Sequence, residues 1–170
     1  LFSAAQIQDL PEALKGSGVL KLGLQTKYEH QPTEPQQKSS PLSIAKNYFL
    51  QQNHPFEALD DQTLKTEVAL QGVSWNVLVY YHSDLQTTMV YSIFPELISE
   101  VSRPKVAEFL VNTNFQLGIG AFEMDMNDGE VRFRTSIPHA GHPIDEALFK
   151  NLFSVNISTM SEFIGDIVSL

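Results

Sequence analysis

Two histidines, His139 and His142, stand three residues apart and are the first candidates for chemistry, since imidazole is a common metal ligand. Pro138, Gly141 and Pro143 surround them and exclude a helix that would hold both rings on one side. No third ligand is evident nearby. We therefore predict a structural loop here and no bound metal.

The acidic run 125–130, Asp-Met-Asn-Asp-Gly-Glu, has some features of a calcium-binding loop. In an EF-hand loop the sixth residue is glycine and the twelfth is glutamate. Here the glycine, Gly129, is the fifth residue, and the twelfth is Ser136. The turn of a β-hairpin accounts for these residues better, and we predict no calcium site.

Three patterns typical of enzymes are present but incomplete. Glu123 and Asp125 could act as paired acids, yet each is expected to face an arginine that keeps it ionised and unfit as a general acid. Ser43-Ile44-Ala45-Lys46 matches the Ser-x-x-Lys of penicillin-recognising enzymes without their later elements. Gly118-Ile119-Gly120 follows a helix, the reverse of a dinucleotide loop. We expect no enzyme, no catalytic residue and no cofactor.

The amino-acid composition argues against two classes of binding partner, nucleic acids and membranes. The 170 residues carry a net charge of −9, and a domain of that sign repels phosphate backbones, so we expect no nucleic-acid partner. No run approaches the roughly 18 apolar residues of a membrane span, so we expect no membrane partner. The absence of cysteine excludes disulfides and thiolate sites and is compatible with a cytoplasmic location.

The chain divides near residue 40. Residues 1–40 hold four Lys and four acids, and residues 25–41 are rich in Gln, Pro and Ser, which is typical of an extended linker. Residues 41–170 hold seven Lys and Arg against sixteen acids and so carry the whole net charge. We expect an N-terminal extension and flexible linker over 1–40, where limited proteolysis should cut first, and one α+β domain over 41–170.

Hydrophobic periodicity predicts the elements of that domain. A helix from Pro41 to about Asn53 is followed by three strands, near 64–71, 75–82 and 87–94, and by a helix over 103–117. Two further strands, near 121–126 and 131–137, and a long amphipathic helix from about Ile144 complete the order α-β-β-β-α-β-β-α. Strands in runs joined by short turns indicate an antiparallel sheet, here of about five strands.

The segment 121–137 gives the most specific structural prediction. Asp128-Gly129 lies between two alternating runs, the strongest short-range signal for a two-residue hairpin turn. Such a turn would place Asp125 opposite Arg132 and Glu123 opposite Arg134, with Met126 opposite Val131 and Met124 opposite Phe133. Acids would then meet arginines and apolar residues would meet apolar residues, as stable sheets require.

The sequence has more apolar surface than a single core needs, and this excess is the feature that favours a binding function. Both faces of the central strands are apolar, and the domain's own helices or a partner could cover the second face. The last helix also has an apolar stripe wider than one sheet face needs. We therefore expect a partner or dimer surface formed by Leu78, Tyr80, Met89, Tyr91, Ile93, Leu148, Leu152 and Val155.

A set of short motifs is spread over roughly 41–170, at 94–95, Arg103, 106–110, 112–114, 118–123, 128–135 and 156–160. Together these motifs resemble the bacterial YbjN family. Ser161 stands where that family tends to have an acid, and 97–99 lacks a proline that the family often has. The resemblance implies a fold similar to type III secretion chaperones, small α+β proteins that usually dimerise, and the label of a sensory-transduction regulator.

We expect a non-enzymatic binding module, chaperone- or adaptor-like, that uses the apolar surface to hold a polypeptide or a second copy of itself. A two-fold homodimer at micromolar concentration is the expected assembly, because it is the commonest way to bury a patch against its copy. The alternative is a small-ligand sensor with a pocket between sheet and helices. Co-purification would separate the two hypotheses.

Overall fold

The computed structural model describes residues 42–70, 72–139 and 144–170, and it confirms an α+β domain with one antiparallel sheet. The sheet has six strands rather than about five, because a short strand precedes the first predicted one. In chain order the elements are α2 (Ser43–Gln51), β1 (Phe56–Ala58), β2 (Thr63–Leu70), β3 (Val73–His82), β4 (Thr87–Ile93), α3 (Arg103–Gln116), β5 (Ala121–Met124), β6 (Val131–Pro138) and α4 (Glu146–Val168).

The additional strand, β1, is held by tertiary contacts rather than by its own sequence pattern. Its three residues are too few for an alternation to be visible. Phe56 packs against Phe49 of α2, with ring centroids 5.6 Å apart, and the Thr66 hydroxyl of β2 donates to the carbonyl of Pro55. These contacts with α2 and β2 explain why reading the segment alone did not find the strand.

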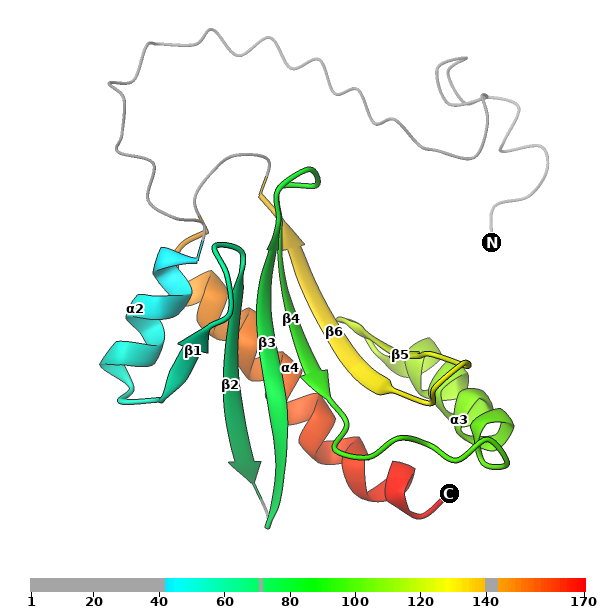
Figure 1. Cartoon of the computed structure of the whole chain (residues 1–170). Coiled ribbons are helices and arrows are strands. Elements are labelled where there is room, and N and C mark those ends of the chain that lie inside the picture. Colours follow the sequence, from blue (N-terminus) through cyan, green and yellow to red (C-terminus); the bar gives the residue numbers. More distant parts are fainter. Residues whose placement is uncertain (1–41, 71, 140–143) are drawn as a thin grey trace, which may run out of the picture. The chain divides into compact units, whose positions relative to one another are not determined.

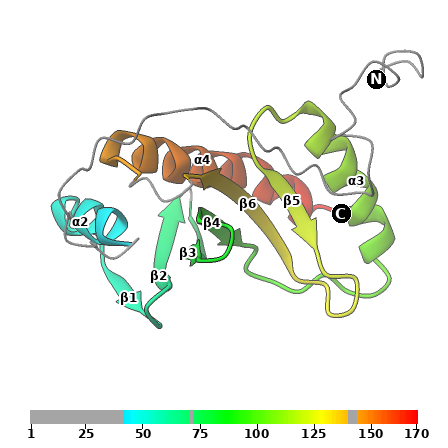
Figure 2. The same cartoon turned by 90° about the horizontal axis from the view of Figure 1, so that it is seen from above.

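All three helices lie on one face of the sheet (Figures 1 and 2). The strands are in the order β1-β2-β3-β4-β6-β5, and α4 runs across β4 and β6. Helix α2 contacts α4 beside β1, and α3 contacts β5 at the opposite end of the sheet. The other face of the sheet, which is turned toward the viewer in Figure 1, has none of the described helices over it. We call it the open face.

The core lies between the sheet and the helices. Trp75, Val77, Val79 and Val90 are buried on the covered face, as are Phe133 and Phe122. The predicted stripe of α4 is also confirmed, since Phe149, Phe153, Met160, Ile164 and Ile167 are all buried. Aromatic contacts hold α4 at both ends, since Phe153 packs on Phe49 of α2 and Phe163 packs on Phe122 of β5.

A polar group, Asn156, is fully buried in the middle of α4. Its Nδ2 donates to the carbonyls of Val90 (2.9 Å) and Phe133 (3.0 Å), which belong to the neighbouring strands β4 and β6. Its Oδ1 accepts from the Ser92 hydroxyl at 2.7 Å, and that hydroxyl accepts from the Trp75 indole at 2.9 Å. The amide therefore fixes the position of α4 over two particular strands.

The predicted register of the β5–β6 hairpin is wrong by two residues. Glu123 lies opposite Arg132, and Met124 opposite Val131. A two-residue type I′ turn needs positive φ at both central residues, but only Gly129 of the pair Asp128-Gly129 has it. The loop instead holds four residues, 126–129, closed by a hydrogen bond from the Gly129 nitrogen to the Asp125 carbonyl.

Arg103 at the start of α3 stabilises this longer loop. Its guanidinium donates to the carbonyls of Met126, Asn127 and Asp128 at 3.0–3.1 Å and to that of Ile98 at 3.2 Å. A two-residue turn would remove these loop carbonyls from its reach. The contact between α3 and the hairpin therefore sets the loop length. The sequence pattern of neither segment reveals this contact.

The side chain of Asn114 joins the other end of α3 to the outermost strand, β5. Its Nδ2 donates to the Phe122 carbonyl at 2.9 Å, and its Oδ1 accepts from the Phe122 nitrogen at 2.7 Å. Both backbone groups of Phe122 are thus satisfied by one amide. Gly120 precedes this strand with a φ of 80°, and a Cβ there would approach the Arg134 carbonyl to 2.7 Å, so the corner requires glycine.

Two predictions concern residues outside this description. The N-terminal extension and its flexible linker fall within residues 1–41, as does the predicted start of the first helix at Pro41. His142 and the middle of its loop also lie outside the described residues. None of the described helices is both long enough and apolar enough to cross a membrane.

Candidate protein-binding face

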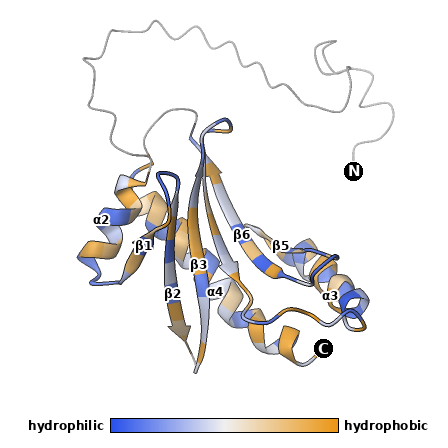
Figure 3. Cartoon of the chain, in the orientation of Figure 1, coloured by the Kyte–Doolittle hydropathy of each residue, from blue (hydrophilic) through white to orange (hydrophobic). Residues whose placement is uncertain are grey.

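The open face brings together the five strand residues that were predicted to form a partner surface: Leu78, Tyr80, Met89, Tyr91 and Ile93. The register places Leu78 opposite Tyr91, and Tyr80 opposite Met89, across β3 and β4. All five are half-buried although the described helices leave this face uncovered. They form an apolar strip along the two central strands, and the hydropathy colouring of Figure 3 shows hydrophobic residues along β3 and β4.

Charged residues lie on either side of this strip. On β2, Lys65 stands opposite Leu78, and on β6, Arg134 stands opposite Tyr91. Arg132 stands between Ile93 of β4 and Glu123 of β5. The open face therefore has an apolar centre with polar margins, the arrangement found in protein-protein interfaces.

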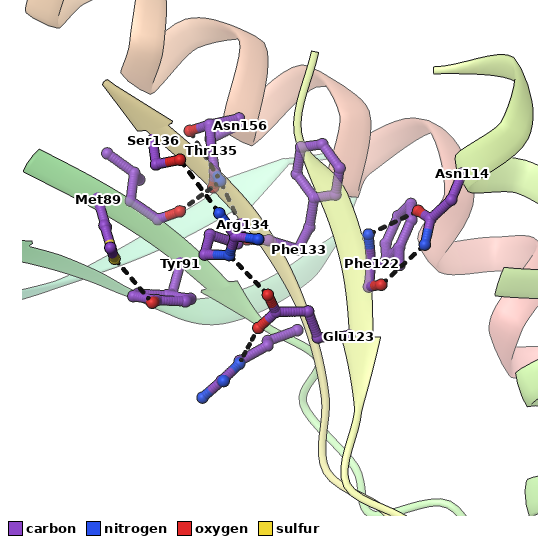
Figure 4. A network of polar contacts seen from close by, with 12 residues as sticks. Met89, Tyr91, Asn114, Phe122, Glu123, Phe133, Arg134, Thr135, Ser136 and Asn156 are labelled. Atoms are coloured by element: carbon purple, nitrogen blue, oxygen red, sulfur yellow. Dashed lines mark hydrogen bonds and ion pairs between the residues drawn. The ribbon is translucent and has the colours of Figure 1, made fainter. Parts of the chain in front are cut away.

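One carboxylate holds both arginines of β6 in place (Figure 4). The two oxygens of Glu123 accept from Nε of Arg132 at 2.8 Å and from Nε of Arg134 at 2.6 Å. Burial alone would raise the pKa of Glu123, but the hydrogen bonds and charges of the two arginines outweigh it, so the pKa lies below its usual value. The residue stays ionised and positions two guanidinium groups beside the apolar strip.

Tyr91 connects the arginines with the apolar strip. The Arg132 guanidinium lies over its ring, 4.9 Å from the centroid, and its hydroxyl donates to the Met89 sulfur at 3.0 Å. Burial raises the pKa of Tyr91 above its usual value, although the charge of Arg132 acts in the opposite direction. The ring is therefore a neutral, fixed platform at the centre of the face.

The three residues predicted on the last helix do not join this surface, because α4 packs on the opposite face of the sheet. Leu152 is buried in the domain's own core, and its carbonyl accepts from the Thr135 hydroxyl, so it offers no partner surface. Leu148 is exposed and Val155 is half-buried. The predicted surface thus divides into a sheet set that lies together and a helix set that lies elsewhere.

The residues that suggested metal or acid chemistry have structural roles where they are described. The His139 ring stacks on Tyr81 and its Nε2 lies 3.2 Å from the Thr88 hydroxyl. Asp125 does not face an arginine as expected; its carboxylate accepts from the backbone and side chain of Asn127 at 2.8 Å. Among the described residues, no three His, Asp or Glu side chains are grouped so that they could hold a metal.

Sequence reasoning missed the roles of Asn156, Asn114 and Arg103. Asn156 interrupts an otherwise apolar stripe of the last helix, and that interruption is a signal for a buried, paired amide. Asn114 and Arg103 gave no such signal, because their partners are backbone groups of distant residues.

No family model matches this chain, and no curated protein matches it either. The resemblance to the YbjN family therefore rests on the motifs quoted above and stays a prediction.

Proposed function

We propose that this protein is a non-enzymatic binding module, chaperone- or adaptor-like, that holds an extended polypeptide segment against the open face of its sheet. The observation that carries the proposal is the apolar strip of Leu78, Tyr80, Met89, Tyr91 and Ile93, which lies under none of the described helices. A cytoplasmic location belongs to the same proposal, since a chain without cysteine has no need of an oxidising compartment.

The charges of the open face indicate the chemistry of the segment. The domain has sixteen acids and seven cations, whereas the charges of this face are closer to balance. Three cations, Lys65, Arg132 and Arg134, stand against four acids, Glu57, Glu67, Glu123 and Glu130. An acidic segment would be repelled by most of the domain and least by this face. We therefore propose a segment with alternating apolar residues, which would contact the strip, and with carboxylates that would pair with Arg132 and Arg134.

The test measures the binding of a labelled peptide that alternates leucine and serine and ends in glutamates, by fluorescence anisotropy. Leu78→Ser should weaken binding about tenfold or more, because it removes the centre of the strip. Leu50→Ser, the same change at an exposed leucine of α2, should leave binding unchanged. A lysine-ended version of the peptide should bind less well.

Failure of the native protein to bind the acidic peptide would overturn the proposal, and so would equal effects of the two substitutions. The small-ligand sensor stays a prediction. Two cavities of about 360 Å³ are present in the described structure, one lined by residues 123–132 of the hairpin and one near Trp75 and Pro95. Neither is lined by a residue of a helix, so neither supports the pocket between sheet and helices that this alternative requires.

A further inference from the structure

The open face carries one oxidisable side chain within its apolar strip, the thioether of Met89. This residue is half-buried on β4, opposite Tyr80 of β3 and Ser136 of β6, and none of the described helices covers it. Peroxides convert a methionine thioether into a sulfoxide, which is polar and chiral at sulfur. The chain contains no cysteine, so no thiol of its own competes for the oxidant.

The other three methionines lie outside the strip. Met160 has no exposed surface in the core, and Met124 packs against the core from β5. Met126 is 52% exposed but belongs to the hairpin loop that follows β5. Met89 is therefore the methionine whose oxidation would change the apolar strip.

The hydroxyl of Tyr91 covers one side of the Met89 sulfur (Figure 4). It donates to the sulfur at 3.0 Å, and the guanidinium of Arg132 holds the tyrosine ring from 4.9 Å above its centroid. A thioether sulfur has two lone pairs, and an oxygen added to one or to the other gives a different sulfoxide epimer. Because the hydroxyl occupies one lone pair, an oxidant reaches the other, and the folded protein should form one epimer in excess.

We propose that Met89 is an oxidation site of the open face, where a peroxide forms predominantly one sulfoxide epimer and thereby releases a bound polypeptide. The lone pair that faces away from Tyr91 attacks one oxygen of hydrogen peroxide, so that an S–O bond forms and the O–O bond breaks. The departing hydroxide takes the proton of the transferred oxygen and leaves as water. The sulfur thus loses the two electrons that the peroxide gains. The release rests on the proposed function, whereas the oxidation site does not.

The product changes the chemistry of the strip. A sulfoxide places a strongly polar oxygen where the thioether was apolar, and covering that oxygen with an apolar side chain leaves it without a hydrogen-bond donor. The Tyr91 hydroxyl lies on the other side of the sulfur and does not meet the new oxygen unless the ring moves. An unpaired polar group of this kind should weaken the binding of an apolar segment about tenfold or more.

Peptide mapping by mass spectrometry, after hydrogen peroxide treatment of the full chain, tests the site. Met89 and Met126 should each gain one oxygen, whereas Met160 should not. Two sulfoxide reductases, each specific for one epimer, then report the stereochemistry in the digested protein. One of them should repair nearly all of the Met89 sulfoxide. Both should repair Met126 to similar extents, because its sulfur forms no hydrogen bond within the described part of the chain.

Tyr91→Phe separates the role of the hydroxyl from that of the ring. The variant keeps the aromatic ring beside Met89 and removes the one donor to its sulfur that the described structure contains. Its Met89 sulfoxide should therefore be a mixture of the two epimers, as at Met126. An unchanged excess of one epimer in this variant would overturn the inference.

Fluorescence anisotropy with the acidic leucine–serine peptide tests the release. Peroxide treatment should weaken binding about tenfold or more in the native protein and in Met126→Leu. Met89→Leu should bind the peptide as the native protein does and should keep that affinity after treatment, because leucine has a similar apolar volume and cannot be oxidised.

The two readouts distinguish failure of the inference from failure of the proposed function. Absence of sulfoxide at Met89, equal amounts of its two epimers in the native chain, or an oxidised protein that binds as tightly as the reduced one would overturn the inference. If the reduced native protein did not bind the peptide, the proposed function and the release would both fall. The sulfoxide analysis, which needs no peptide, would still decide whether Met89 is the oxidation site.

Discussion

Replacing Asn156 with alanine should reveal how strongly the buried amide holds α4 to the sheet. The side chain has no exposed surface and makes hydrogen bonds to both β4 and β6, to the carbonyls of Val90 and Phe133. Alanine removes these bonds and leaves the Ser92 hydroxyl without an acceptor in the core.

The magnitude follows from these groups. A buried donor left unpaired costs roughly 1–3 kcal/mol, and each of the two lost bonds to carbonyls about 0.5–1.5 kcal/mol. The higher helix propensity of alanine returns at most about 0.7 kcal/mol. We therefore expect Asn156→Ala to lower the free energy of unfolding by roughly 2–5 kcal/mol, with a melting temperature lower by about 10 °C.

Urea denaturation followed by circular dichroism measures this change. Asn151→Ala is the matched control, because it is the same substitution at an exposed position of the same helix, and it should change stability by less than about 0.5 kcal/mol. A Ser92→Ala and Asn156→Ala double-mutant cycle should show a coupling energy of about 1 kcal/mol or more. If Asn156→Ala were no more destabilising than Asn151→Ala, the reasoning about the buried amide would be refuted.

Three further changes test other parts of the domain. Gly129→Ala should lower the free energy of unfolding, measured by urea denaturation, by roughly 1–3 kcal/mol or more, because Gly129 has a φ of 88° and a Cβ would collide with the Ile98 carbonyl. Gly118→Ala is the control and should be near neutral, because its Cβ would meet nothing. Equal effects of the two substitutions would contradict this account. Arg103→Lys should speed amide hydrogen exchange in the hairpin loop, since lysine cannot bind four carbonyls in a planar arrangement, and unchanged exchange would count against it. The lowered pKa of Glu123 means that the folded state binds fewer protons than the unfolded state, so stability should fall as the pH drops below 4.5. Glu123→Gln should flatten this dependence of stability on pH. Identical pH profiles of the native protein and the variant would argue against it.

Much of the fold could be predicted from local patterns. Alternation along β3 and β4 correctly grouped Leu78 and Tyr80 on one face, because a strand has a fixed period of two, but it did not tell which face the helices cover. The apolar stripe of α4 could be predicted for the same reason, because a helix has a fixed period of 3.6 residues. These regularities depend on neighbours in the chain, which a sequence displays directly.

What could not be predicted depends on contacts between distant residues. The hairpin loop is four residues long because Arg103 binds its carbonyls, and Asp128-Gly129 alone indicates a shorter turn. The short strand β1 exists because Phe56 finds Phe49. Leu152 was wrongly assigned to a partner surface. The width of the apolar stripe did not reveal that the domain's own core buries this residue.

The two hydrogen bonds between the Asn114 side chain and β5 affect how a partner can recognise the domain. A strand at the border of a sheet normally offers backbone groups on which another chain can add itself, either as a ligand or as the first step of aggregation. At Phe122 those groups are already occupied by an amide that imitates a neighbouring strand. Strand addition at Phe122 is therefore blocked. A partner that approaches β5 at this point must be recognised through side chains rather than through these backbone groups.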